Sequence, residues 1–237
     1  MSRTEEQKAK LAQSFNHIHI ELDHSIPNRN TDTRWKAISD FTHLSRSITG
    51  GPRAMYDKDR IIFQIERTRV LSLQMIDRIP HDRWLEMPRG ITHVAWNVGH
   101  IAIAEYFLGL VLIRGMKESD QDFMPNRFPE LFGYGSVASN EPSRYPSPTE
   151  ILNVLNSVHD RVLSETKAIP EHELAEPCKF LEGEFDHHPI FEDRGGALEW
   201  LTFHEHIHIG TIGLLRRELG GEPIQYLQES REGKRFV

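Results

Sequence analysis

The chain has 237 residues, of which 38% are hydrophobic and 27% charged, and its formal net charge at pH 7 is -7. The length suits one domain with additions. The acidic balance gives no electrostatic reason to expect a nucleic-acid partner, because such binding needs concentrated Lys and Arg. A single cysteine, Cys178, excludes an intrachain disulfide framework and suits the cytoplasm.

The sequence predicts neither a signal peptide nor a membrane span. The first residues are polar, unlike a secretory leader. The longest apolar stretch, residues 101–113, is interrupted by Glu105 and is too short to cross a bilayer. We therefore expect a protein without a membrane partner.

Residues 1–56 differ in pattern from the rest and predict an extension packed on a main domain. Residues 5–15 have the spacing of an amphipathic helix, whereas residues 17–22 alternate like a strand. Gly50-Gly51-Pro52 marks a break. We expect three parts: an N-terminal extension (1–56), a helical domain (57–221) and a C-terminal tail (222–237).

Two helices are predicted in the first half of the main domain. The first runs from Asp57, with apolar residues at helical spacing, and stops before Pro80. The second runs from about residue 92 to residue 116, with an apolar stripe on one face. Its stripe comprises Trp96, His100, Ile103, Phe107 and Leu110.

Two further helices are predicted in the second half. The third begins at Ser147, which serves as the N-cap, and Glu150 completes a capping box. Ile169-Pro170 ends it. The fourth runs from about residue 196 to residue 219, and Gly220-Gly221 supplies its C-cap.

Four amphipathic helices of about 20 residues each predict an all-α four-helix bundle. Two connections, residues 117–147 and 170–195, are longer than the turns of a bundle require, and loops of that length usually carry function or cover a site. The aromatic and glycine-rich residues 128–136 fit either an ordered surface loop or the wall of a substrate pocket.

Three of the fourteen histidines form a candidate metal site. His204 and His208 are four residues apart, so on a helix their Cβ atoms lie roughly 5–6 Å apart on one face, where they can share an ion. His100 occupies a core-facing position of the second helix between Trp96 and Ile103. Three inward histidines are costly to bury without a partner. They favour a shared divalent metal, and three nitrogen ligands would leave the open position that is typical of catalytic sites.

A second interpretation uses Glu205. Residues 204–208 spell H-E-x-x-H, the motif of zinc proteases, in which the Glu is a general base. The extended protease pattern fails, because Thr211 stands in place of Gly and Leu214 in place of His. Glu205 is also predicted to lie off the apolar stripe of its helix. A metalloprotease is therefore the less favoured alternative.

The other polar candidates are predicted to lie outside the ligand set. His206 is predicted to point away from the metal ligands, and His93 to lie too far along its helix to share the ion. His159 is the best candidate for a fourth polar group in the bundle, although a boundary histidine with one hydrogen bond is favoured. His187-His188 could approach the open end of the bundle. Cys178 is expected to be an unreactive thiol.

The assembled motifs resemble the DinB/YfiT-like family of DinB-like metal-binding four-helix-bundle proteins. The resemblance rests on residues 96–102 (WNVGHIA) and 203–220 (FHEHIHIGTIGLLRRELG). Residues 132–136 (FGYGS), followed by Tyr145-Pro146-Ser147, resemble the loop before the third helix in one branch. The resemblance as a whole covers roughly residues 57–221.

The resemblance implies that one histidine of the second helix and two of the fourth bind a divalent ion, Zn²⁺ or Ni²⁺, and these match His100, His204 and His208. The family is similar in fold to transferases that use bacillithiol, mycothiol or glutathione, and it includes a maleylpyruvate isomerase. A metal stabilises thiolate over thiol and so supplies a nucleophile at neutral pH. Many members have Arg-Gly-Gln after the last ligand, where this chain has Ile209-Gly210-Thr211, so the thiol and the substrate stay open.

The leading expectation is a cytoplasmic metalloenzyme that transfers a thiol to a small electrophilic molecule or hydrolyses one. Catalytic side chains other than the metal ligands are unassigned. One alternative is a non-catalytic metal-binding protein of stress or DNA-damage response, and another is a bundle without metal. A homodimer is implied by the resemblance alone.

Overall fold

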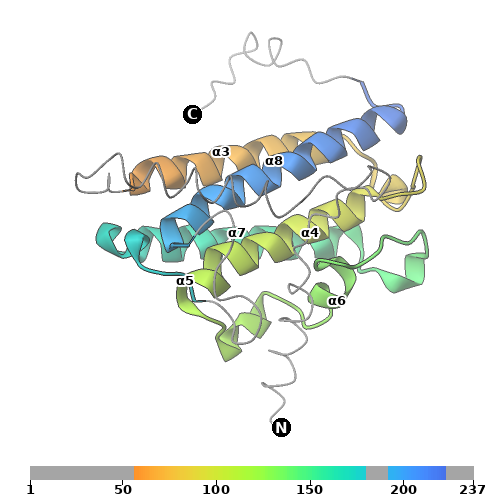
Figure 1. The fold of residues 1–237 in the computed structure, drawn as a ribbon. Coiled ribbons are helices and arrows are strands. Elements are labelled where there is room, and N and C mark those ends of the chain that lie inside the picture. The colour runs from red at the N-terminus through yellow and green to blue at the C-terminus, as the bar shows by residue number, and fades with distance from the viewer. Residues whose placement is uncertain (1–55, 180–191, 223–237) are drawn as a thin grey trace, which may run out of the picture.

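The computed structural model describes residues 56–179 and 192–222, and in this part of the chain the secondary structure is helical (Figure 1). Its long helices are α3 (Lys58–Asp77), α4 (Val94–Tyr106), α7 (Pro148–Ala168) and α8 (Arg194–Glu218). Helices α7 and α8 both pack against α3, and both also pack against α4. The predicted all-α four-helix bundle is confirmed.

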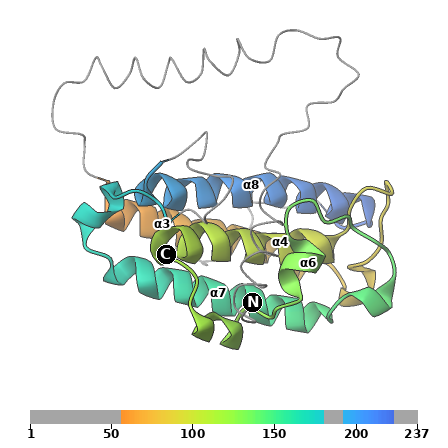
Figure 2. The same ribbon diagram turned by 60° about the horizontal axis from the view of Figure 1, so that its bottom comes forward.

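Short helical segments occupy the connections. Helix α6 packs against α4, and the two lie beside each other in both views (Figures 1 and 2). The predicted extension (1–56) and tail (222–237) lie almost wholly outside the described residues, so the division into three parts stays a prediction. The short segments are η1 (His81–Arg83), η2 (Phe107–Val111), α5 (Leu112–Arg114), η3 (Glu118–Asp122), α6 (Phe128–Phe132), η4 (Pro142–Arg144) and η5 (Glu171–Ala175).

The caps explain where the helices begin and end. At α7 the Ser147 hydroxyl accepts from the Glu150 backbone N–H, and the Glu150 carboxylate accepts from the Ser147 N–H at 2.7 Å, so the predicted capping box is confirmed. Helix α8 begins two residues before the predicted start, because Asp193 accepts from Gly196 N at 2.9 Å. Gly220, at φ 77°, follows the end of α8 in the left-handed region that glycine favours.

The second predicted helix is not uninterrupted. Between α4 and α5 the chain makes a π-helical segment, Phe107–Val111. Within it, a Cβ added at Gly109 would lie 2.8 Å from the Val162 side chain, so the glycine allows η2 and α7 to approach closely. The apolar pattern predicted the helix and gave no sign of this change in winding.

The combined helix Val94–Arg114 is long and apolar enough to cross a membrane, contrary to the expectation that the apolar stretch is too short. However, 89% of its most apolar window is buried inside the bundle. Its length and hydropathy are those of a core helix, which is covered on nearly all sides by the protein itself.

A buried ionic network joins the four long helices. Arg69 of α3 donates from Nη2 to Glu105 Oε2 of α4 at 2.5 Å and from Nε to Glu205 Oε1 of α8 at 3.0 Å. On α7, Arg69 Nη1 donates to the Leu155 carbonyl at 3.2 Å. The His159 Nδ1–H donates to the second oxygen of Glu105 at 2.7 Å.

The charges in this network are almost completely removed from water. The side chains of Arg69, Glu105 and Glu205 are 3%, 1% and 2% exposed. Burial alone would raise the pKa of Glu105, but the charge of Arg69 and the hydrogen bond from His159 lower it. The Ser72 hydroxyl also donates to Glu205 at 2.5 Å. Each charged group therefore has the partners that buried charges require.

The network corrects the prediction for Glu205, which was expected to lie off the stripe of its helix. The side of α8 that faces the core instead contains Leu201, Glu205 and Ile212, all of which are buried. His204 and His208 lie to one side of these residues and are only half-buried. The helix is thus rotated by part of a turn from the predicted orientation.

Replacing Arg69 by Met should destabilise the protein by about 3–5 kcal/mol, because it leaves two carboxylates buried without their cation. Urea unfolding followed by circular dichroism measures this loss. The control is Lys167→Ala, which removes an exposed ion pair with Glu66 and should cost less than about 1 kcal/mol. Equal losses in the two variants would contradict the role given to Arg69.

Candidate metal centre

Three histidine side chains converge between α4 and α8. His100 comes from α4, and His204 and His208 come from successive turns of α8. One ligand atom from each ring can be chosen such that all three atoms lie within 4.8 Å of one another. The ring centroids are 5.2 Å apart for His100 and His204, 4.7 Å for His100 and His208, and 4.8 Å for His204 and His208.

A backbone carbonyl orients His100. Its Nδ1 lies 2.6 Å from the Phe132 carbonyl oxygen, which can only accept, so Nδ1 carries the proton and Nε2 keeps its lone pair. Phe132 reaches this position because Gly99 has no side chain: a Cβ there would lie 2.5 Å from the Phe132 ring. The glycine before His100 therefore allows α6 to hold the imidazole from behind.

Asn97 orients His208 in the same way. The Asn97 Nδ2 donates to Thr92 Oγ1 at 3.0 Å and to the His93 carbonyl at 2.9 Å, which assigns the other amide atom as oxygen. That oxygen lies 2.9 Å from His208 Nδ1, so Nδ1–H donates and Nε2 is again the free nitrogen. Such outer hydrogen bonds fix the tautomer of histidines that ligate metals.

The three imidazoles are neutral at physiological pH. Burial, and then the neighbouring imidazoles, lower the pKa of His204 to about 3 and that of His208 to about 2. Burial also lowers the pKa of His100, although the bond to the Phe132 carbonyl opposes this shift. Protons therefore do not compete for the nitrogen lone pairs at pH 7.

This donor set fits a divalent transition metal. Neutral imidazole nitrogens are common ligands of zinc and nickel. A tetrahedral zinc with bonds of about 2.0–2.1 Å holds its ligand nitrogens roughly 3.3 Å apart. The ligand atoms here lie within 4.8 Å of one another, so binding would bring the nitrogens closer to one another. Three ligands also leave the coordination sphere incomplete.

The cluster opens toward the surface. His100 is 8% exposed, whereas His204 and His208 are half-buried. Trp96 stacks on the His100 ring with centroids 4.7 Å apart and planes 10° apart, and its Nε1 donates to Ser136 Oγ at 2.9 Å. The segment 128–136 therefore borders the histidines on the α4 side as well as packing by its own aromatic residues.

The comparison with known families agrees with this geometry. The profile of the DinB superfamily matches residues 64–212, well over half of the chain and all three histidines. The chain belongs to the DinB superfamily. A search of curated proteins found no match. Membership, together with the histidine cluster, supports a DinB-like protein that could hold a divalent ion.

Two further histidines in the DinB-like domain form hydrogen bonds with the backbone of the helices that carry the cluster. His206 is exposed, as predicted, and its Nδ1–H donates to the Thr202 carbonyl of its own helix at 2.6 Å. His93 is the N-cap of α4: its Nδ1 accepts from Trp96 N at 2.9 Å, and its Nε2–H donates to the Ser139 carbonyl at 3.0 Å. Neither ring belongs to the cluster.

His159 and Cys178 are not members of the cluster. His159 makes the one hydrogen bond that was favoured for it, to Glu105 in the ionic network. Cys178 is buried, and burial raises the pKa of its thiol to about 12, as suits an unreactive cysteine. His187-His188 lie outside the described residues.

The position of Glu205 contradicts the protease alternative. Oε1 accepts from Arg69 and Ser72, and Oε2 lies 3.3 Å from Arg69 Nη2. The carboxylate is 2% exposed and points into the bundle, where it cannot reach a water molecule at the surface opening. The H-E-x-x-H letters therefore do not form a protease site.

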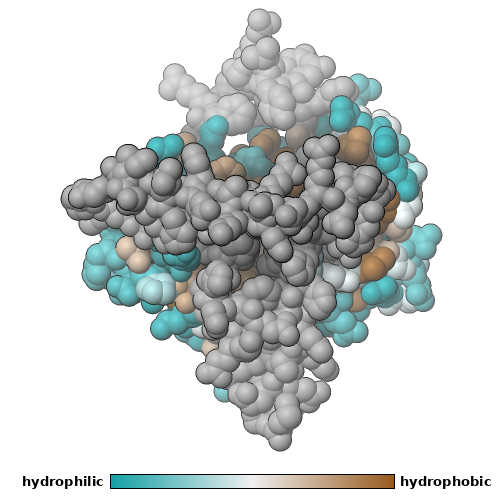
Figure 3. Space-filling view, in the orientation of Figure 1, coloured by the Kyte–Doolittle hydropathy of each residue, from teal (hydrophilic) through white to brown (hydrophobic). Residues whose placement is uncertain are grey.

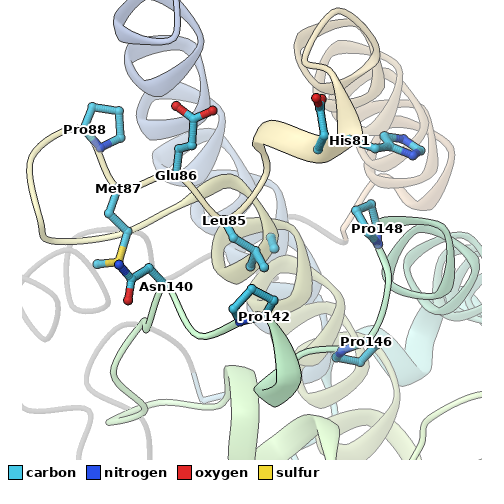
Figure 4. Close-up of a pocket in the computed structure, with 11 residues that line it drawn as sticks. His81, Leu85, Glu86, Met87, Pro88, Asn140, Pro142, Pro146 and Pro148 are labelled. Atoms are coloured by element: carbon cyan, nitrogen blue, oxygen red, sulfur yellow. The ribbon is translucent and has the colours of Figure 1, made fainter.

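A cavity of about 650 Å³ lies at one end of the bundle, between the α3–α4 connection and the start of α7 (Figure 4). Leu85, Pro142, Pro146 and Pro148 lie around it, with Glu86 and His81 at its edge. None of the three clustered histidines lines it, so it is a separate hollow from the opening at the cluster.

Asn97 and Arg69 were missed by sequence reasoning. Asn97 is a polar side chain in the otherwise apolar turns before His100, and Arg69 interrupts an apolar stripe at Ile65 and Ile76. A polar residue on a buried face needs a partner, so each interruption was a usable signal.

The His208→Ala variant should lose most of the bound metal, because it removes one of three ligands from the cluster. The control is His206→Ala, two residues away on the exposed face, which should retain it. Elemental analysis after loading with one equivalent of Zn²⁺ measures both. Equal metal content in the two variants would refute the ligand assignment.

The Asn97→Ala variant should bind metal about 10–100-fold more weakly, because His208 loses the acceptor that fixes its ring. Competition with a chromophoric chelator measures the affinity, and circular dichroism reports whether the variant is folded. Asn156→Ala, at an exposed asparagine of α7, is the matched control. An unchanged affinity in a folded Asn97→Ala variant would show that Asn97 does not position the ligand.

Proposed function

We propose that this DinB-superfamily protein is a divalent-metal-dependent enzyme that acts on a small molecule. His100, His204 and His208 would hold Zn²⁺ or Ni²⁺. The observation that carries the proposal is the convergence of three neutral imidazoles that are partly open to solvent. A structural zinc site usually has four protein ligands, whereas a catalytic site keeps a position open.

The reaction we propose is thiol transfer to, or metal-assisted hydrolysis of, a small electrophile. A bound divalent ion would lower the pKa of a water molecule or thiol in the open position and so supply a nucleophile at neutral pH. The protein's part is to hold the ion and fix its ligands. Phe132 and Asn97 fix two of the ligands, because they accept hydrogen bonds from the far sides of the His100 and His208 rings. Trp96 borders the opening.

The competing proposal is a metal-binding stress or DNA-damage-inducible protein without turnover. Its support is that the cluster joins α4 to α8, so an ion would cross-link two helices of the bundle. The two proposals differ in whether the fourth position of the ion can be occupied by an external ligand.

We further propose a cytoplasmic location, since the single cysteine is buried and suits a reducing compartment. A homodimer is proposed from the family resemblance. The acidic net charge supports a small-molecule substrate over a nucleic acid.

The experiment is to load the metal-free full chain with Co²⁺ and add azide. The proposed enzyme should show a change in the visible d–d bands, because azide takes the open position, whereas a closed site should show none. Zinc-loaded protein should also accelerate either the alkylation of a thiol or the hydrolysis of an activated ester. His206→Ala should retain this activity and His208→Ala should lose it. No spectral change and no turnover above the metal-free baseline would refute the proposal.

A further inference from the structure

The described segments that carry or contact the histidine cluster lack Lys and Arg. Residues 94–113 of the helix that carries His100 include no Lys or Arg, and neither do residues 195–215 of α8. The segment 128–139, which supplies Phe132 and Ser136, also has none. Two of the carboxylates in these stretches, Glu105 and Glu205, are held inside the bundle by Arg69.

The face of α8 that carries the ligands continues outward as an apolar surface. Ile207 precedes His208 and lies one turn after His204, yet its side chain is 59% exposed. Trp200 lies one turn before His204, and its ring centroid is 6.2 Å from that of Phe203, which is 62% exposed. Hydrophobic side chains are visible among hydrophilic ones on the described surface (Figure 3).

Trp96 provides an aromatic wall on the α4 side. Its ring stacks on His100 and lies 6.2 Å from His208 by ring centroids. The opening is therefore bordered by Trp96 on one helix and by Trp200 and Ile207 on the other. Apolar and aromatic surfaces of this kind favour apolar ligand groups.

We propose that the ligand of this centre is a molecule with an uncharged aryl or alkyl body attached to a single metal-binding or electrophilic atom. The inference rests on the proposed metal-dependent function. An ion held by three neutral imidazoles keeps its full +2 charge, so it attracts one anionic or polarised atom. Additional carboxylates or sulfonates on the ligand would find no Lys or Arg in the stretches that border the opening. Placing them against Trp200 or Ile207 would cost free energy.

The test compares two thiols on the Co²⁺-loaded full chain. Benzyl mercaptan carries an aryl body, and 2-mercaptoethanesulfonate carries an anionic one. Titration of the near-ultraviolet thiolate-to-cobalt charge-transfer band gives each Kd. Benzyl mercaptan should bind at least tenfold more tightly. Equal affinities, or tighter binding of the sulfonate, would overturn the inference while leaving the metal site intact.

A charge-introducing variant tests the assignment of the opening. Ile207→Lys should reduce the ratio of the sulfonate Kd to the benzyl mercaptan Kd at least fivefold, because the new ammonium gives the sulfonate a partner. The matched control is Leu214→Lys, on the same face of α8 but nearly two turns farther along and 37% exposed, which should keep the wild-type preference. Circular dichroism checks that both variants fold.

The outcomes separate the two levels of the proposal. Failure of Co²⁺ to bind the wild type would overturn the proposed function, and the ligand preference with it. Cobalt binding with a preference that Ile207→Lys does not change would overturn the placement of Ile207 at the opening. A preference that Ile207→Lys narrows and Leu214→Lys leaves unchanged would support the inference.

Discussion

The buried guanidinium of Arg69 is the constraint on which the arrangement of this bundle depends. It lies between Glu105 of α4 and Glu205 of α8, and His159 of α7 completes the network. Buried carboxylates without a cation are strongly destabilising, so these contacts select one rotation for each helix. Because Glu205 must face inward, His204 next to it is turned sideways toward α4. The network therefore sets the side of α8 on which the ligands lie.

The rotation of the helices thus places carboxylates and imidazoles in different environments. The carboxylates point inward and neutralise Arg69, whereas the imidazoles point between α4 and α8, where they form no ion pair with the described residues. Burial lowers the pKa of His204 and His208 and keeps both rings neutral. Hydrogen bonds from His100 to Phe132 and from His208 to Asn97 direct Nε2 toward the shared space. One packing arrangement therefore explains both the charge balance in the core and the free imidazole nitrogens beside it.

Much of the fold and part of the site could be predicted from the sequence. The capping box at Ser147 and the helical periodicities are local signals, and they placed the helices to within a few residues. The spacing of His204 and His208, with His100 on an apolar stripe, predicted the three rings that converge in the structure. The ionic network was missed because its partners are 36 and 136 residues apart, beyond the reach of any local pattern. The prediction for Glu205 was wrong because a periodicity argument treats a charged residue as solvent-facing. Periodicity cannot show that Arg69 lies in the core and pairs with this carboxylate.

The central claim is that three imidazoles bind one ion and leave a position open. X-ray absorption spectroscopy at the zinc edge of the loaded protein tests it most directly. The account predicts multiple scattering from three imidazoles at about 2.0–2.1 Å together with a light, exchangeable ligand. A spectrum with sulfur or carboxylate ligands in place of the imidazoles, or with four protein ligands and no exchangeable one, would contradict it.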